Sequence, residues 1–114
     1  MRLAEKHCEK CTPDTPTLTE AEITEQLGLL DGWRLAQRDG RPFITRTFKF
    51  KGFMPGVDMV NRIAALAEAE GHHPDLQLTY GSLTVELSTH VAGGVTENDF
   101  ILGARIDEDQ SPKS

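Results

Sequence analysis

The chain has 114 residues and a formal charge of −6 at neutral pH. This length is typical of one globular domain with a single core, small enough for association between copies to add stability. The acidic balance argues against nucleic-acid binding, which needs a basic face to neutralise phosphates. No run approaches the roughly 18 apolar residues of a membrane span, and the first residues lack the apolar segment of a secretory signal, so we expect a cytoplasmic protein.

Residues 1–16 include two prolines and are predicted to form a flexible N-terminal arm. The arm carries His7, Cys8 and Cys11, with the cysteines in a Cys-x-x-Cys arrangement. Tetrahedral zinc takes four ligands, and only three candidates are local. Two reduced thiols in a cytoplasmic protein are therefore the favoured interpretation, and no metal site is predicted.

The domain itself is predicted over residues 17–108. Thr19 and Glu22 have the spacing of a capping box, which opens a short helix that ends at Gly28. The helix should lead directly into the first strand of a sheet.

Two strands are predicted next. The first runs from Trp33 to Arg38, and Asp39-Gly40 is its turn. The second runs from Phe43 to Phe50, where apolar and polar residues alternate. A short turn between them predicts an antiparallel pair.

A long helix is predicted over residues 53–70. Apolar residues at i, i+3 and i+4 spacing predict its core-facing stripe, which consists of Phe53, Val57, Val60, Ala64 and Ala67. Gly71 supplies a C-terminal stop, and Pro74 disfavours helix for the residue before it. Glu68 lies off the stripe, one helical turn before His72.

The next two alternating runs are separated by Gly81-Ser82, which predicts a β-hairpin with a two-residue loop. That loop sets Tyr80 opposite Leu83 and pairs apolar residues along the whole hairpin. Counting outward places His73 opposite His90, where Cβ atoms of facing residues lie roughly 4.5–5.5 Å apart.

A Gly93-Gly94 turn precedes the last helix, which is predicted from about Glu97 to Asp107, and residues 109–114 form a polar tail. The order of elements is αββαββα. It predicts an α+β fold in which helices pack on one face of a four-stranded antiparallel sheet.

The predicted elements bring chemically active side chains to one corner: His72, His73, His90, Glu68, Asp99 and Tyr80. Histidine can give and take protons near neutral pH, because its unperturbed pKa is about 6.5. Two histidines and a carboxylate could also hold zinc or Fe(II). Adjacent histidines on an extended segment point to opposite faces, however, so metal catalysis is the less favoured interpretation.

Three of these residues also have purely structural explanations. Asp99 could complete a capping box with Thr96, Glu68 could be an ordinary exposed helix residue, and Tyr80 could pack on the apolar face of the hairpin. A purely structural role is the weakest explanation for the convergence of the three histidines.

The spacing of these residues resembles the signature of the pterin-4a-carbinolamine dehydratases. The matching positions are Glu68, His72-His73-Pro74, Tyr80, Ser88-Thr89-His90, Gly94, Thr96 and Asp99, with Asp31-Gly32-Trp33 at the start of the first strand. The resemblance covers about residues 19–107. It implies the same α+β fold, a homodimer or homotetramer, and an enzyme that needs neither a metal nor another cofactor.

The resemblance further implies the dehydration of 4a-hydroxytetrahydropterin to quinonoid dihydropterin, which recycles the cofactor of aromatic amino-acid hydroxylases. A hydroxylase is then a candidate partner. Histidines can act as general acid and base in this reaction. The implied roles are His72 and His90 on the 4a-hydroxyl side and His73 on the ring or the N5 proton, although acid and base could interchange.

Supporting roles are implied for two carboxylates. Glu68 and Asp99 would keep a histidine protonated or fix its tautomer. The implied substrate contacts are His73, Pro74, Tyr80, Ser88 and Thr89.

An alternative from a different class stays open. The resembled family includes dimerisation partners of a transcription factor and proteins with assembly roles that do not need the chemistry. The complete set of histidines favours an enzyme. Partner binding would instead use the exposed face of helix 53–70 or an edge of the sheet.

Overall fold

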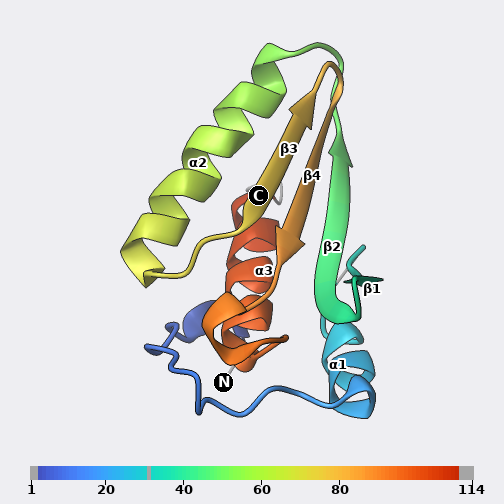
Figure 1. Cartoon of the computed structure of the whole chain (residues 1–114). Helices are drawn as coiled ribbons and strands as arrows, with labels where there is room; N and C mark the ends of the chain where they lie inside the picture. Colours follow the sequence, from blue (N-terminus) through green and yellow to red (C-terminus); the bar gives the residue numbers. More distant parts are fainter. Residues whose placement is uncertain (1–2, 31, 111–114) are drawn as a thin grey trace.

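The computed structural model describes residues 3–30 and 32–110, in which three helices and a four-stranded sheet enclose one core (Figure 1). The main elements in chain order are α1 (Glu20–Leu27), β1 (Arg34–Arg38), β2 (Arg41–Lys49), α2 (Met54–Glu70), β3 (Asp75–Thr79), β4 (Ser82–Leu87) and α3 (Glu97–Gln110). Two short 3₁₀ helices are also present: η1 (Leu3–Glu5) precedes α1, and η2 (His90–Ala92) lies between β4 and α3. Asp31 of the predicted Asp31-Gly32-Trp33 run lies outside the described residues.

The sheet is antiparallel throughout, with the strand order β1-β2-β4-β3. Alternate residues of β4, namely Leu83, Val85 and Leu87, are fully buried on one face. Buried side chains of α2 and α3 join the same core as these residues. The predicted α+β fold is confirmed.

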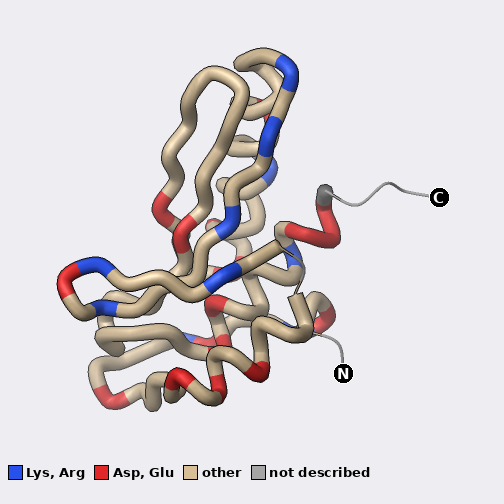
Figure 2. Tube along the Cα trace, turned by 90° about the vertical axis from the view of Figure 1, so that its right-hand side faces the viewer, with Lys and Arg blue, Asp and Glu red and all other residues tan. Residues whose placement is uncertain are grey.

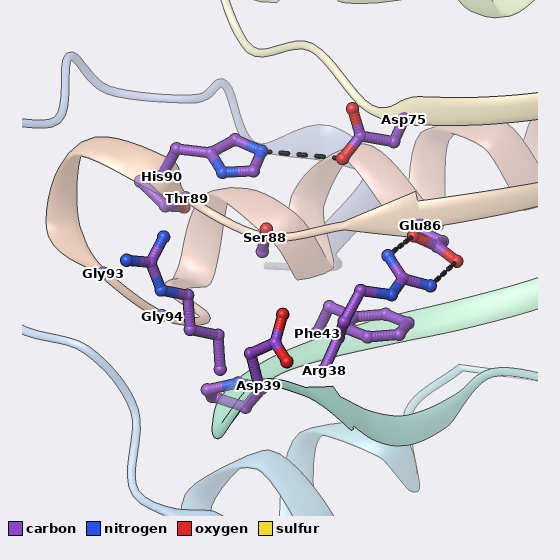
Figure 3. Close-up of a pocket in the computed structure, with 12 residues that line it drawn as sticks. Arg38, Asp39, Phe43, Asp75, Glu86, Ser88, Thr89, His90, Gly93 and Gly94 are labelled. Atoms are coloured by element: carbon purple, nitrogen blue, oxygen red, sulfur yellow. Dashed lines mark hydrogen bonds and ion pairs between the residues drawn. The ribbon is translucent and has the colours of Figure 1, made fainter.

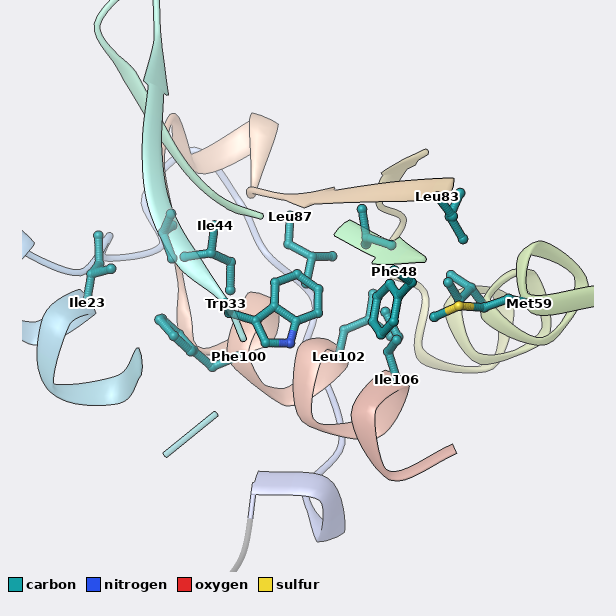
Figure 4. Close-up of a cluster of buried hydrophobic side chains, with 13 residues drawn as sticks. Ile23, Trp33, Ile44, Phe48, Met59, Leu83, Leu87, Phe100, Leu102 and Ile106 are labelled. Carbon is teal, nitrogen blue, oxygen red and sulfur yellow. The ribbon is translucent and has the colours of Figure 1, made fainter. Parts of the chain in front are cut away.

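The core extends from α1 across the sheet to α3 (Figure 4). Trp33 lies within it at 7% exposure, and its indole N–H donates to both carboxylate oxygens of Asp107 at 2.9 Å. Arg46 of β2 donates to Asp107 Oδ1 at 2.8 Å. This carboxylate therefore ties the start of β1 and the middle of β2 to α3.

The predicted ends of several elements are confirmed. Thr19 and Glu22 form the reciprocal capping box at the start of α1, with Gly28 as the C-cap. Asp39 and Gly40 both have positive φ, at 53° and 76°, in the turn between β1 and β2. Figure 2 shows Lys and Arg along β1, β2 and the turn after β2. Acidic residues lie along α1 and at the end of α3 (Figure 2).

The predicted core-facing stripe of the long helix is confirmed at Ala67 and is wrong by one residue over the rest of its length. The buried residues of α2 are Gly56, Met59, Ile63 and Ala67, whereas Phe53 is 44% exposed and Ala64 is exposed. A shift of one residue turns the face by about 100°. A Cβ at position 56 would lie 2.7 Å from Leu78 Cδ1, so the face containing glycine is the one that can approach the sheet closely.

The predicted hairpin register is also wrong, by two residues. Ser82 pairs with Thr79 and Leu83 with Leu78, so the two-residue loop is Tyr80-Gly81. Gly81 has φ +81°, a backbone conformation that glycine adopts readily. A shift by two keeps every side chain on its predicted face.

The two ends of the chain differ from their predicted descriptions. α3 continues to Gln110, so the described part of the predicted tail is helical. The arm lies against the body of the domain: Lys6 pairs with Glu97 of α3 at 2.7 Å, and the Arg105 guanidinium donates to the Lys6 carbonyl. Within residues 3–30 and 32–110, none of the helices has the length and apolar character needed to cross a membrane.

Candidate active site

His72 is turned inward by the way α2 ends. Gly71 takes a left-handed conformation at φ 65°, and its N–H bonds to the Ala67 carbonyl. The His72 N–H bonds to the same carbonyl at 3.2 Å, which closes a Schellman-type turn. The chain reverses there, and the His72 side chain is left only 10% exposed.

Asp99 fixes that histidine from the first turn of α3. The Asp99 side chain is fully buried, and its Oδ1 lies 2.6 Å from His72 Nε2. Its Oδ2 accepts from the Thr96 N–H at 2.9 Å and from the Thr89 hydroxyl at 3.0 Å. An ionised carboxylate only accepts hydrogen bonds, so with Asp99 in that form the contact requires a proton on His72 Nε2.

The capping role and the histidine-holding role proposed for Asp99 therefore coexist. Its carboxylate accepts from the Thr96 N–H, as in a capping box. The Thr96 hydroxyl, however, pairs with the Thr89 hydroxyl at 2.8 Å. The start of α3 is thereby bonded to the end of β4 as well as to His72.

His73 points the other way and pairs with Glu68. Its Nε2 lies 2.5 Å from Glu68 Oε2, and the two side chains are 60% and 77% exposed. The sequence spacing had set Glu68 beside His72 instead. That placement is wrong, because the reversal at Gly71 carries His72 into the interior and leaves His73 on the side of the helix where Glu68 lies.

His90 begins η2, and its Nε2 lies 3.5 Å from Asp75 Oδ2, with both side chains exposed (Figure 3). The prediction that His90 directly faces His73 is wrong, since the observed register pairs Asp75 with Glu86. Asp75 was not predicted as a site residue.

The three histidines border one cavity of about 500 Å³. Its walls are the α2–β3 connection (residues 70–73), the segment 88–91 after β4, and residues 9–11 of the arm with Asn98. We call it the histidine cavity. Proton-exchanging groups thus line a space large enough for a small heterocycle.

A second cavity of about 390 Å³ also has His90 in its lining (Figure 3). It is lined by the β1–β2 turn, Asp75 and Glu86, and it shares Ser88, Thr89 and His90 with the histidine cavity. Across it, the Arg38 guanidinium makes two hydrogen bonds to Glu86 at 2.9 and 3.0 Å. His90 therefore borders both cavities.

Two of the predicted substrate contacts are not brought into these cavities. Tyr80 is 81% exposed at the β3–β4 turn, at the opposite end of β3 from Asp75. The prediction that Tyr80 converges with the histidines is wrong, because the loop includes it. Pro74 lines neither cavity, whereas Ser88 and Thr89 line both.

The arm contributes residues that sequence reasoning did not assign to the site. Glu70, whose side chain is 6% exposed, accepts from the Cys8 N–H at 2.7 Å and contacts His7 Nδ1 at 2.9 Å. Burial alone would raise the pKa of Glu70, but these two hydrogen bonds and the nearby Arg105 outweigh it and lower the pKa. The end of α2 therefore binds the arm through an ionised carboxylate.

Glu70→Gln is expected to lower the free energy of unfolding by about 1–2 kcal/mol at pH 7. A carboxyl whose pKa is lower in the folded chain stabilises it above the unfolded pKa, about 4.3, and loses that contribution as the pH falls through the folded value. The difference between the variant and the native chain should therefore shrink below about pH 4. Urea unfolding from pH 7 to pH 3 measures it, and a difference that stays constant would contradict the assigned role.

No group of three or more His, Cys, Asp or Glu side chains within residues 3–30 and 32–110 is arranged to hold a metal ion. Cys8 and Cys11 are both free thiols. Burial, followed by the negative charges of Glu70 and Asp99, raises the pKa of Cys8 to about 12. This thiol is therefore protonated at neutral pH.

Comparison with known proteins gives a consistent result. The family model described as "Pterin 4 alpha carbinolamine dehydratase" matches residues 16–108. A protein of Marinobacter nauticus named "Putative pterin-4-alpha-carbinolamine dehydratase" is 42% identical over 106 residues, which cover 93% of this chain and 96% of that protein. A protein of Methylococcus capsulatus with the same name is 40% identical and covers 93% and 91% of the two chains.

Two solved structures are also similar. The structure of a transcriptional coactivator/pterin dehydratase from Brucella melitensis has 40% identity and a TM-score of 0.74, covering 82% of this chain and 97% of that one. A pterin dehydratase-like protein described as a RuBisCO assembly factor in the alpha-carboxysome has 22% identity and a TM-score of 0.56, covering 68% and 87%, and shows the fold alone. Since the family model and the curated relatives match nearly the whole domain, the chain belongs to the pterin-4a-carbinolamine dehydratase family.

Proposed function

We propose that this protein dehydrates 4a-hydroxytetrahydropterin to quinonoid dihydropterin by general acid and base catalysis from its histidines. The observation that carries the proposal is that three histidines border one cavity and each has a carboxylate beside it. The family membership makes a pterin the substrate to test first.

The reaction breaks the C4a–O bond and forms a C4a–N5 double bond. An acid must protonate the departing hydroxyl, which leaves as water, and a base must take the proton from N5. One proton is delivered and one is removed, so the enzyme returns to its starting state after the two histidines exchange a proton with solvent. Each such proton transfer typically accelerates a reaction about 10²- to 10⁴-fold.

Exposure and hydrogen bonding support the roles that we propose for the three histidines. His90 and His72 act on the 4a-hydroxyl, with His90 exposed to the substrate and His72 oriented by Asp99. His73 contacts the ring or takes the N5 proton, with Glu68 beside it. The acid and base roles could be exchanged between His73 and the His72–His90 pair. One proton would still be delivered to the hydroxyl and one removed from N5.

Ser88 and Thr89 differ in what they offer the substrate. Ser88 lines both cavities and is available to bind the ring. The Thr89 hydroxyl already donates to Asp99, so Thr89 orients Asp99 and, through it, His72. Pro74 and Tyr80 are left out of the proposed contacts because they lie outside both cavities.

The experiment that tests the proposal follows the ultraviolet absorbance of freshly generated 4a-hydroxytetrahydropterin. The native chain should accelerate the loss of this adduct, and a His72→Ala/His90→Ala variant should not. No acceleration by well-folded native protein would overturn the proposal. The physiological setting we propose is the recycling of the pterin of an aromatic amino-acid hydroxylase.

A second candidate is a non-catalytic role as an assembly partner. A pterin dehydratase-like protein of this fold is described as a RuBisCO assembly factor. The observation that favours it lies at the start of α2, where the apolar side chains of the N-cap residue Phe53 and of Met54 are 44% and 63% exposed. We also propose that the protein forms a homodimer or homotetramer, and this exposed apolar surface is a suitable contact between its copies. Phe53→Ser should weaken association in sedimentation experiments and leave the histidine cavity intact, whereas unchanged association would exclude this surface.

A further inference from the structure

The N-terminal arm forms one wall of the histidine cavity. Glu9, Lys10 and Cys11 line it together with Asn98, opposite walls that belong to the α2–β3 connection and to the segment after β4. The two other walls carry the histidines. The arm wall has no histidine and contributes a carboxylate, an ammonium group and a thiol, with the Asn98 amide beside them.

The arm wall is held in place by a buried amide. Asn98 is 6% exposed, and its Oδ1 accepts from the Glu9 N–H at 3.0 Å, while its Nδ2 donates to the Glu9 carbonyl at 2.6 Å. The same Nδ2 lies 3.0 Å from Cys11 Sγ. With Glu70 holding Cys8, the arm is fixed to α2 just before the wall and to α3 within it.

The chemistry of the substrate indicates what would lie against that wall. In a tetrahydropterin, the atoms that react are C4a and N5, and C6 is bonded directly to N5. A substituent on C6 therefore leaves the ring within one bond of the atom that loses its proton. When histidines from two walls face C4a and N5, the substituent extends along the wall that has no histidine.

We propose that Lys10 and Cys11 contact the C6 substituent and select for short, hydroxylated side chains. This proposal rests on the proposed function. Among residues 3–30 and 32–110, Lys10 is the only Lys or Arg that lines the histidine cavity, and its ammonium group can donate to a hydroxyl. Cys11 is small and held against Asn98, so the length of the substituent is limited where the wall meets α3.

The test compares kcat/KM for two 4a-hydroxytetrahydropterins, one with a 6-methyl and one with a 6-(1,2-dihydroxypropyl) group. Lys10→Met should lower the preference for the dihydroxypropyl compound about 3- to 10-fold through KM, because one hydrogen bond to a charged donor is lost. Cys11→Phe should discriminate against the longer substituent by about tenfold or more and leave kcat for the methyl compound unchanged. Unchanged ratios in both variants would overturn the proposal.

Two matched controls separate selectivity from general damage to the arm. Thr12→Phe adds the same ring at the next position, which is exposed and lies outside the cavity lining, and Lys51→Met removes an exposed lysine elsewhere. Both should keep the native ratio. A change of the ratio in Thr12→Phe as large as that in Cys11→Phe would also overturn the proposal.

A binding measurement keeps this test separate from the test of the reaction. The Cys8 thiol is protonated and resists alkylation, so iodoacetamide labels Cys11 selectively, as mass spectrometry can verify. We expect 7,8-dihydropterin with a dihydroxypropyl group to protect Cys11 and the unsubstituted compound to protect it less. Equal protection by the two compounds, or none, would overturn the arm-wall assignment even if the native chain proved inactive as a dehydratase.

Discussion

Replacing His90 with alanine is expected to lower turnover of 4a-hydroxytetrahydropterin about 10²- to 10⁴-fold. The same change should alter the free energy of unfolding by less than about 0.5 kcal/mol. The reason for this separation is that the His90 side chain is 71% exposed and its Nε2 lies 3.5 Å from Asp75, in contact with solvent. Stopped-flow absorbance measures the first quantity and urea unfolding the second.

Tyr80→Phe is the matched control, because Tyr80 belongs to the predicted set but lies at the far end of the hairpin. It should retain native turnover. If His90→Ala were as active as the native chain, His90 would have no part in proton transfer. His90 would then line both cavities without taking part in the reaction.

Asp99→Ala is expected to lower the free energy of unfolding by about 3–5 kcal/mol, the largest stability effect we predict. Its carboxylate is fully buried and accepts hydrogen bonds from His72, Thr89 and the Thr96 N–H, so three buried donors would lose their acceptor together. Urea unfolding measures the loss. Glu68→Ala is the control, because it removes an equally close carboxylate–histidine contact that is exposed and should contribute only about 0–1 kcal/mol.

The same residue should also affect the reaction. Asp99→Asn keeps the shape of the side chain but removes the charge that fixes the His72 tautomer, so the pH profile of kcat should change in form as well as in height. Thr96→Ala keeps the carboxylate and the Thr96 N–H. It should therefore retain the native profile, and an identical profile for Asp99→Asn would reduce Asp99 to a purely structural role.

The architecture could be predicted from the sequence because local signals agreed with it. The capping box at Thr19, the Asp39-Gly40 turn and the stop at Gly71 are each specified by residues close in sequence, and each is confirmed. The opposite directions of His72 and His73 also followed from extended geometry, and their burial confirms them.

The hairpin register could not be obtained from the hydrophobic pattern. Registers that differ by two residues place every apolar side chain on the same face, so the pattern is equally consistent with both. The turn decides between them. A positive φ of 81° at the second loop position favours glycine, and that requirement selects Tyr80-Gly81 over Gly81-Ser82.

The contribution of the arm was missed for a different reason. Its contacts join Cys8 to Glu70 and Glu9 to Asn98, positions far apart in the sequence and without any periodic pattern. Only the packed structure brings them together. The pairing of Glu68 with His73 was missed as well, because it depends on the reversal of the chain at Gly71.

The opening turn of α3 determines the alignment of two parts of the site at once. Asn98 holds the arm and Asp99, the next residue, holds His72. Because consecutive helical residues differ in direction by about 100°, moving the start of α3 by a single residue would misdirect both side chains together. We therefore expect insertions or deletions in residues 93–95 to damage the site far more than those at the β3–β4 turn. Family members that lose this spacing should have lost both pterin chemistry and the docking of the arm.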